Sequence, residues 1–252
     1  MDKITQLAKM IDHSLLHPTM TDEQLQKGCE IAKKYNTASV CIKPYAVKLA
    51  AEWLKGTDVL IGTVIGFPHG NSAVEIKVAE TEKACQDGAA EIDMVVNTGK
   101  VLSKDWDYVE KEISAVLKAC HKHKSILKVI FENDFLPTDD FKIKLCEICS
   151  KAGVEFVKTS TGYGFVKGDD GKYSYLGATE HDLKLMRKYS DSQVQVKAAG
   201  GIRTLDELLA AKKCGATRVG ATATVAILEE ARKRFGKNAS DSEATMDDTP
   251  GY

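Results

Sequence analysis

Several charged residues of this chain occur in segments whose other residues are typical of buried strands. In EFVKTSTGYGF (155–165), Lys158 follows two apolar residues and precedes three small hydroxyl residues. Four more charged residues lie in similar segments: Lys197 in QVQVKAAGG, Lys128 in SILKVIF, and Glu91 and Asp93 in EIDMVVN. Because moving a charge out of water is costly, these residues need a chemical or an ion-pairing reason for their position.

The alternation of side chains along a strand predicts which way these charges point. Successive strand residues point to opposite faces, and the residues that flank the lysines, such as Val157 and Val196, are apolar. The apolar residues need a covering layer, so the charged groups share the inner face of a closed sheet. Since neighbouring strands lie about 4.8 Å apart, the lysines should lie close to one another and to Asp93.

A cluster of this kind favours a reactive amine at Lys158. Burial and a cationic neighbour such as Lys197 both lower the pKa of a lysine, and a neutral amine attacks carbonyls to form a Schiff base. The protonated imine supports the making or breaking of a carbon–carbon bond, while Asp93 and a water held by Lys197 move protons. The alternative is an ion-pair network that fixes strand register without any catalytic role.

Eight short apolar runs with helical segments between them predict the scaffold that holds these residues. They span residues 11–16, 39–42, 60–67, 91–97, 125–131, 156–162, 193–201 and 218–222. Strand and helix alternate strictly, which favours a parallel sheet, and eight such units in 252 residues fit an α/β (β/α)8 TIM barrel. The alternative is a doubly wound open sheet, which the lack of G-x-G-x-x-G after the first strand disfavours.

Local signals predict where elements begin and end. Ser72 with Glu75, and Thr204 with Glu207, have the spacing of capping boxes. The long loop 162–178 contains GDDGK, which is typical of a hairpin tip.

No composition break divides the chain. We expect a single catalytic barrel over residues 1–236, with a short N-terminal helix, followed by a polar, flexible tail over residues 237–252.

Composition and charge exclude several classes of protein. The chain is 43% hydrophobic and 28% charged with a net charge of −1, so no field favours nucleic acid or an anionic membrane. No apolar run approaches the ~20 residues of a membrane span, and the N-terminal segment lacks the apolar core of a secretory signal. We therefore expect a cytoplasmic protein whose partners are small-molecule substrates, and a homo-oligomer remains open.

The seven cysteines are odd in number and scattered through apolar segments, which favours reduced thiols over a disulfide framework. Cys146 and Cys149 form a lone C-x-x-C on one face of a predicted helix, where core packing is the simpler interpretation. No histidine or cysteine spacing matches a known ligand set, so we expect neither a metal nor another cofactor.

The ends of the last two predicted strands favour phosphate binding. In barrels of this type, the loops after strands seven and eight often bind phosphate. Gly200, Gly201 and Gly220 allow close approach of the backbone there, and Thr222 adds a hydroxyl group. Arg203 either adds a positive charge to this site or forms a salt bridge on the surface.

Several motifs, taken in order, resemble a known enzyme family. The motifs are VCIKP (40–44), GFPHG (66–70), EIDMVV (91–96), LKVIFE (127–132), FVKTSTG (156–162) and VKAAGGIR (196–203). They are similar to those of the class I, metal-independent 2-deoxyribose-5-phosphate aldolases. The resemblance extends from about Ile11 to Phe235, and two lysine motifs preceded by an aspartate motif make it specific.

The resemblance implies reversible cleavage of 2-deoxy-D-ribose 5-phosphate to D-glyceraldehyde 3-phosphate and acetaldehyde, in deoxyribonucleotide catabolism and without a cofactor. It implies that Lys158 forms the Schiff base, that Lys197 perturbs Lys158, and that Asp93 shuttles protons. The other matched positions line the pocket or surround the substrate phosphate: Lys128, Asp12 and Cys41 in the pocket, and Gly162, Gly200, Gly201, Gly220 and Thr222 around the phosphate.

The chain departs from the family pattern in places. Tyr163 stands where some members carry a phosphate-binding lysine, and Lys167 or Lys172 are candidates to replace it. Ala223 stands where many members have one of two paired serines. Some members end in a tyrosine that folds back to the active site and relays a proton; this chain ends in Tyr252, for which an inert tail is the alternative.

Two further functions stay open at this point. One is another sugar-phosphate aldolase, or an isomerase or synthase that uses Asp93 and a lysine as acid and base without a covalent bond. The other is a barrel that only binds a phosphorylated metabolite. A buried lysine pair beside an aspartate argues against the second, because phosphate binding alone does not need it.

Overall fold

The computed structural model describes residues 2–236 and contains a closed barrel of eight parallel strands. Around the ring the order is β1-β10-β9-β6-β5-β4-β3-β2, so each strand lies beside the next barrel strand in the chain and the last pairs with the first. The barrel strands are β1 (Ile11–Leu15), β2 (Ser39–Ile42), β3 (Leu60–Ile65), β4 (Glu91–Val95), β5 (Ile126–Ile130), β6 (Phe156–Lys158), β9 (Gln195–Ala199) and β10 (Ala216–Ala221).

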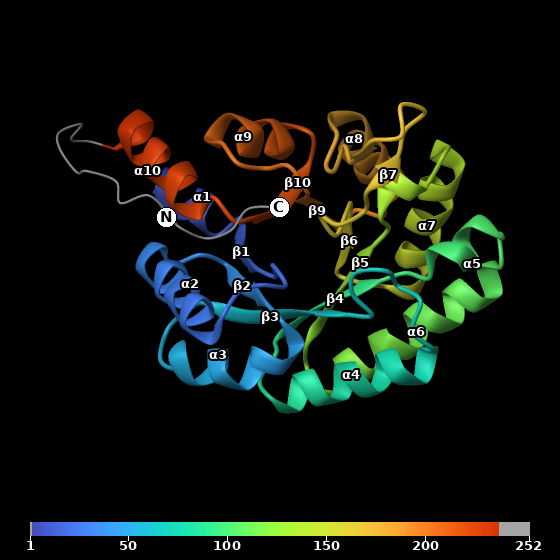
Figure 1. Cartoon of the computed structure of the whole chain (residues 1–252), viewed down its shortest axis with the longest axis horizontal. Coiled ribbons are helices and arrows are strands. Elements are labelled where there is room, and N and C mark those ends of the chain that lie inside the picture. The colour runs from blue at the N-terminus through green and yellow to red at the C-terminus, as the bar shows by residue number, and fades with distance from the viewer. Residues whose placement is uncertain (1, 237–252) are drawn as a thin grey trace.

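Helices surround this ring (Figure 1). They are α1 (Lys3–Ala8), α2 (Asp22–Tyr35), α3 (Val47–Trp53), α4 (Val74–Gln86), α5 (Thr98–Leu102), α6 (Trp106–Lys122), α7 (Asp139–Ala152), α8 (Glu180–Tyr189), α9 (Leu205–Lys213) and α10 (Thr224–Phe235), with short 3-10 turns at η1 (Pro44–Ala46) and η2 (Asn133–Phe135). The predicted (β/α)8 barrel and its short N-terminal helix are confirmed, and the open-sheet alternative is excluded by the closed ring. No helix within residues 2–236 is long and apolar enough to span a membrane.

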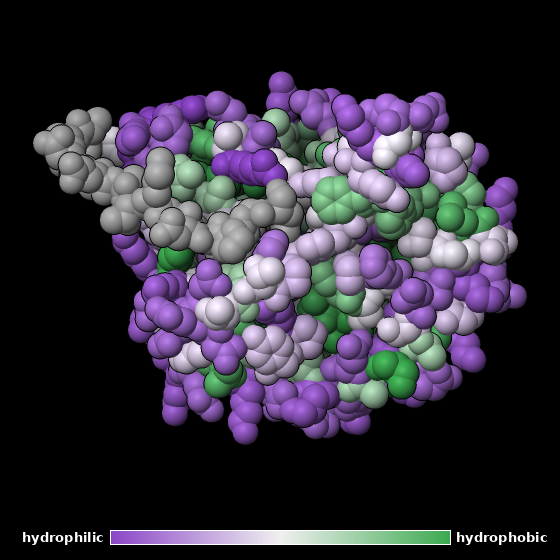
Figure 2. Space-filling view, in the orientation of Figure 1, coloured by the Kyte–Doolittle hydropathy of each residue, from purple (hydrophilic) through white to green (hydrophobic). Residues whose placement is uncertain are grey.

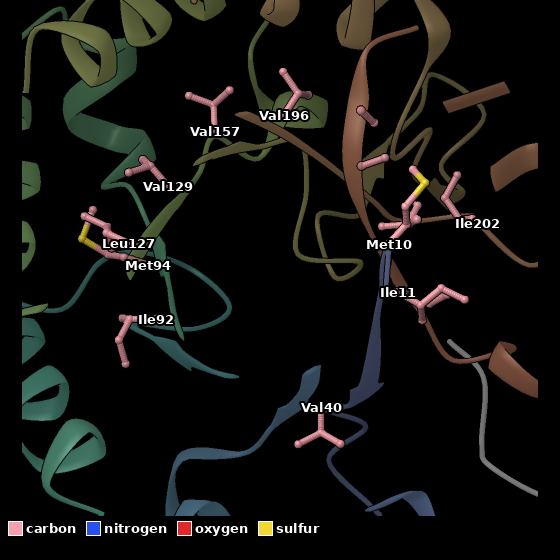
Figure 3. Packing of buried hydrophobic residues seen from close by; sticks show 14 of the residues in the cluster. Met10, Ile11, Val40, Ile92, Met94, Leu127, Val129, Val157, Val196 and Ile202 are labelled. Atoms are coloured by element: carbon pink, nitrogen blue, oxygen red, sulfur yellow. The ribbon is translucent and has the colours of Figure 1, made fainter. Parts of the chain in front are cut away.

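The main hydrophobic core lies between the strands and the helices. Figure 3 shows Ile92, Leu127, Val157 and Val196 pointing outward from the ring of strands, and all four are fully buried. They belong to one continuous apolar cluster that includes helix residues. This outward burial leaves the alternate residues of the same strands facing the barrel interior.

Most predicted strands were too long at their carboxyl ends. The sixth was expected over residues 156–162, but β6 ends at Lys158. Beyond it, Thr159 still bonds to β9 and to the 3-10 turn η2 that follows β5, since its N–H donates to the Lys197 carbonyl and its own carbonyl accepts from the Asn133 N–H. The hydroxyl residues therefore form a rim above the strand.

One predicted capping box is present and the other is not. The Thr204 side chain accepts from the Glu207 N–H and the Glu207 carboxylate accepts from the Thr204 N–H, as expected for the start of α9. The prediction of Ser72 as the cap of α4 is wrong, because α4 begins at Val74 and its N-cap, Ala73, has no side-chain hydrogen bond.

The long loop after β6 folds as a hairpin, as predicted. Its strands, β7 (Val166–Lys167) and β8 (Tyr173–Ser174), pair antiparallel, and β7 lies between α7 and α8 in Figure 1. Val166 and Tyr173 are exposed on it, and Figure 2 shows hydrophobic surface beside this position. The seven cysteines are free thiols, and Cys146 and Cys149 are buried in the core as expected.

Candidate active site

Seven charged side chains meet inside the barrel and form one connected network. The cations are Lys128, Lys158, Lys197 and Arg218, and the carboxylates are Asp12, Glu91 and Asp93. Six of them are at most 3% exposed, and Arg218 is partly buried. The inward direction predicted for the charges of β4, β5, β6 and β9 is therefore correct, and β1 and β10 contribute as well.

Strand register places Lys158 and Lys197 side by side. Lys158 and Lys197 are paired positions of β6 and β9. Both ammonium groups contact the same oxygen of Asp93, with Nζ–Oδ2 distances of 2.7 Å in each case. Asp93 therefore links the two lysines, and Lys197 also reaches Asp12 at 2.5 Å.

Lys158 is the member of the network that releases its proton most easily. Burial lowers the pKa of Lys158; the Asp93 carboxylate raises it and the Lys197 ammonium lowers it again, so that the pKa lies below the usual lysine value. The pKa of Lys197 is raised instead, since Asp12 and Asp93 together outweigh the effect of burial.

A charge count supports this assignment. If all groups are ionised, the network holds four positive and three negative charges, so the loss of one proton makes it neutral. Within the network Lys158 contacts one carboxylate, whereas Lys197 contacts two and Lys128 contacts three. The lysine with the fewest carboxylate partners is the one whose positive charge is least stabilised.

The Asp93 carboxylate stays ionised. Burial alone would raise the pKa of Asp93, but Lys128, Lys158 and Lys197 outweigh burial and hold the pKa well below its usual range. In the free protein Asp93 is thus an ionised hydrogen-bond acceptor, and the Lys197 ammonium donates to it at 2.7 Å.

A cavity opens above this network at the carboxyl ends of the strands. At its floor lie Lys158 and Lys197, with Cys41 from β2 beside them, and at its far end lie the turns after β9 and β10. The lining residues are Ser14, Leu16, Cys41, Lys158, Thr161, Tyr175, Lys197, Ala199, Gly200, Gly201, Ile202, Arg203, Gly220, Ala221 and Thr222. This is the face on which TIM barrels carry their active sites.

The two turns expected to bind phosphate do line this cavity. Gly200 and Gly201 have φ values of 88° and 86°, a left-handed conformation that glycine adopts without a steric cost. Gly200, Gly201, Arg203, Gly220 and Thr222 all lie along the wall of the cavity, and their binding of phosphate stays a prediction. A site of backbone N–H groups and small side chains at two helix starts suits an anion.

Other predicted residues lie elsewhere. Gly162 is not among the lining residues, although its neighbour Thr161 is. Asp12, Asp93 and Lys128 lie beneath the cavity floor, within the ion-pair network. Tyr252 lies outside the described residues.

The candidate replacements for a phosphate-binding lysine are not in the cavity. Lys167 and Lys172 are exposed on the hairpin and do not line it. Tyr163 lies in a second, mostly apolar cavity of about 360 Å³, where its ring packs edge-on against Phe67 with the centroids 5.6 Å apart.

Two residues that contribute to the site, Arg218 and Tyr175, had no predicted role. Arg218 bonds Asp12 and Glu91 from β10, and its alternation with buried Val219 would have placed it inward. Tyr175 follows β8 and lines the cavity, but no periodicity in a loop reveals such a position.

Glu132 is a third residue without a predicted role. It is 1% exposed and has a φ of 57°, which is unusual for a residue other than glycine. Its carboxylate accepts from the N–H of Thr161 at 3.2 Å and from the Thr161 hydroxyl, so it fixes the rim above Lys158. Burial is the main cause that raises the pKa of Glu132 to about 7.

One group of side chains within residues 2–236 has the spacing of metal ligands, namely Asp139, His181 and Asp182. The ammonium of Lys142 already contacts two of them, at 2.6 Å from Asp182 and 3.5 Å from Asp139. The Lys142 ammonium therefore explains the cluster, which is an ion pair between α7 and α8. The expectation of a metal-free protein stays a prediction.

Comparison with known proteins gives a consistent result. Residues 6–232 match the DeoC/LacD family aldolases. The chain is 50% identical over 239 residues to the deoxyribose-phosphate aldolase of Rhodopirellula baltica, with 95% of each chain covered. It is 48% identical over 229 residues to the deoxyribose-phosphate aldolase of Clostridium perfringens, with 91% of this chain and 96% of that one covered.

Solved structures agree with these matches. A putative deoxyribose-phosphate aldolase from Coccidioides immitis has a TM-score of 0.83 and 37% identity, covering 91% of this chain and 87% of that one. The deoxyribose phosphate aldolase of Aeropyrum pernix, described as having a unique tetrameric structure, has a TM-score of 0.81 and 27% identity, covering 92% of this chain and 93% of that one.

Proposed function

The chain belongs to the DeoC/LacD family of aldolases, and we propose that it cleaves 2-deoxy-D-ribose 5-phosphate reversibly to D-glyceraldehyde 3-phosphate and acetaldehyde. The observation that carries this proposal is the position of Lys158, a buried lysine of lowered pKa at the floor of the cavity, with Lys197 and Asp93 in contact. The barrel of residues 2–236 supplies all three of these groups.

In this proposal the neutral amine of Lys158 attacks C1 of the open-chain sugar, and loss of water gives a protonated Schiff base. Removal of the proton from the C3 hydroxyl breaks the C2–C3 bond, and the electron pair moves to the imine. D-Glyceraldehyde 3-phosphate leaves and an enamine remains on Lys158. Protonation of the enamine at C2, followed by hydrolysis, releases acetaldehyde and the free amine.

Proton transfer is assigned to Lys197 and Asp93. The protonated Nζ of Lys197 lies 2.7 Å from the oxygen of Asp93 that also contacts Lys158. A proton can therefore pass between these groups and a substrate atom above Lys158, directly or through a water molecule. When Lys158 becomes an iminium, the same Asp93 oxygen stabilises its positive charge.

Reductive trapping tests the covalent step. Treatment with acetaldehyde and borohydride should leave an N-ethyl group on Lys158, identified by intact mass and peptide mapping. Lys172→Met, which removes an exposed hairpin lysine, is the matched control and should be trapped as efficiently as the wild type. An unmodified Lys158 under these conditions would contradict the proposal.

The non-covalent alternatives predict different outcomes. Turnover that survives Lys158→Met would favour acid–base catalysis by Asp93 and Lys197, whereas the Schiff-base route predicts a loss of at least about 10⁴-fold. Binding without cleavage of any sugar phosphate would indicate a non-catalytic barrel. Turnover should be unchanged in EDTA, and a loss of activity in the chelator would indicate a metal enzyme instead.

A further inference from the structure

The residues that follow the hairpin form one side of the substrate cavity. Tyr175, directly after β8, lines it together with Lys158, Gly200 and Arg203. The position is at the end of the cavity away from the barrel floor, beside the turn after β9. A Cβ placed on Gly200 would lie 3.5 Å from Cε2 of the Tyr175 ring, so the ring directly adjoins that turn.

Backbone contacts of the three residues that follow Tyr175 fix its position. The N–H groups of Leu176 and Gly177 donate to the two carboxylate oxygens of Asp134. The N–H of Ala178 donates to the Gly200 carbonyl at 3.1 Å. A Cβ on Gly177 would lie 2.5 Å from that carbonyl oxygen, so the segment passes too close to the turn for a larger residue.

The ring itself is held from the hairpin side. Phe165 and Tyr175 pack edge to face with their centroids 5.2 Å apart. The ring is half-buried between Phe165 and the cavity. A phenol in this position offers one O–H donor whose ring needs little further ordering when a ligand binds.

The phosphate end of the cavity has few cations for a doubly charged group. Of the described residues that line the cavity, Lys158, Lys197 and Arg203 are cationic, and the first two belong to the interior network. Backbone N–H groups and neutral hydroxyls must therefore supply much of the binding. A hydrogen bond from a neutral hydroxyl to a charged acceptor is stronger than one between neutral groups.

We propose that the Tyr175 hydroxyl donates a hydrogen bond to the phosphate group of the substrate and thereby selects phosphorylated over unphosphorylated sugars. The inference rests on the proposed function, because Schiff-base formation at Lys158 fixes C1 at the floor and directs the phosphate toward the Gly200 turn. Tyr175 is a specificity-determining residue in this scheme, and the bond-breaking step does not use it.

The test is a KM-against-kcat comparison for Tyr175→Phe, which keeps the ring and its packing on Phe165. We expect KM for 2-deoxyribose 5-phosphate to rise about tenfold, with kcat within a factor of two. KM for unphosphorylated 2-deoxyribose should not change. Tyr173→Phe is the matched control, because Tyr173 is on the same hairpin and 66% exposed, and it should behave as the wild type.

Two results would overturn the proposal. One is a wild-type KM for the phosphorylated sugar in Tyr175→Phe, and the other is an equal rise in KM for both sugars, which would indicate a role in shaping the cavity only. Calorimetric titration with inorganic phosphate should show about tenfold weaker binding to Tyr175→Phe. That titration does not need turnover. It therefore still tests the role of Tyr175 if the wild-type protein turns out to cleave no sugar phosphate.

Discussion

At the level of single side chains, the basicity of each interior lysine depends on how many carboxylates it contacts. Lys128 contacts three carboxylates and Lys158 contacts one, so the positive charge of Lys158 is the less stabilised of the two. The neighbours of a lysine thus matter as much as its burial. A substitution of one neighbouring residue should therefore change the pKa of Lys158 although Lys158 itself is unaltered.

Lys197→Met tests this dependence. Removal of the ammonium takes away a group that lowers the pKa of Lys158, so that pKa should rise and the acid limb of kcat/KM should move to higher pH. Loss of the proton donor should also lower kcat by about 10²- to 10⁴-fold. Lys197→Arg keeps the charge and should leave the limb in place; a limb that does not move in Lys197→Met would contradict the assignment.

Glu132 should make stability depend on pH. Its pKa is raised from 4.5 to about 7 in the folded protein, so the folded state holds the proton more tightly than the unfolded state. The resulting stabilisation is present below pH 4.5 and is lost as pH rises toward 7, by roughly 3 kcal/mol at most.

Glu132→Gln removes this titration and keeps an acceptor for Thr161. Denaturant unfolding at pH 5, 6, 7 and 8 measures the difference between the two proteins. The wild type should lose stability relative to the variant between pH 5 and 7. A constant difference across that range would show that Glu132 has an ordinary pKa.

At the level of elements, the fully buried ion pair between Lys77 of α4 and Glu112 of α6 connects both helices to the strands. Lys77 donates to Glu112 at 2.6 Å and to the carbonyl oxygens of Gly70 and Val95, each at 2.7 Å. Glu112 also accepts from the Asn97 N–H. The pair therefore fixes the loop after β3 and the end of β4, the strand that carries Asp93.

Lys77→Met leaves the Glu112 carboxylate buried without its partner, which should lower the free energy of unfolding by about 3–5 kcal/mol. The double variant Lys77→Met/Glu112→Leu removes both charges and should recover much of that loss. Urea unfolding of the three proteins measures both effects. A double variant as unstable as the single one would mean that packing, rather than the unpaired charge, is responsible.

The regularity of each strand decided how well the sequence predicted which side chains face the barrel interior. Alternation around Val157 and Val196 correctly placed Lys158 and Lys197 inside, because a strand has only two faces. Arg218 was missed at the expected beginning of the last strand, next to a register irregularity between Ala216 and Arg218.

Tyr175 could not have been placed from the sequence. Its position depends on contacts between the hairpin, Asp134 and the Gly200 turn, which are far apart along the chain. Glu132 was visible within LKVIFE, but its backbone conformation and its contact with Thr161 are tertiary properties.

At the level of the whole molecule, the two ends of the described chain meet. α1 packs against α10, and the Lys3 ammonium lies 3.3 Å from the centroid of the Phe235 ring. The sheet is closed and covered by residues 3–235.

Removal of residues 237–252 should therefore change the unfolding midpoint by less than about 2 °C, a shift that corresponds to under about 1 kcal/mol at this size. Differential scanning calorimetry of the truncated and full chains makes the comparison. A much larger decrease of the unfolding midpoint would show that the segment stabilises the fold. Tyr252→Phe, assayed for kcat in the full chain, separately tests the proton relay suggested by the family resemblance.

Asp12 and Arg218 bond across the seam where the first barrel strand pairs with the last. Arg218 is also the register partner of Lys197, so the interior ion-pair network has its full set of contacts only when β10 pairs with β1 and the ring closes. β10 is the last barrel strand to be synthesised by the ribosome. The complete interior ion-pair network therefore forms only after the last barrel strand has been synthesised and has paired with the first.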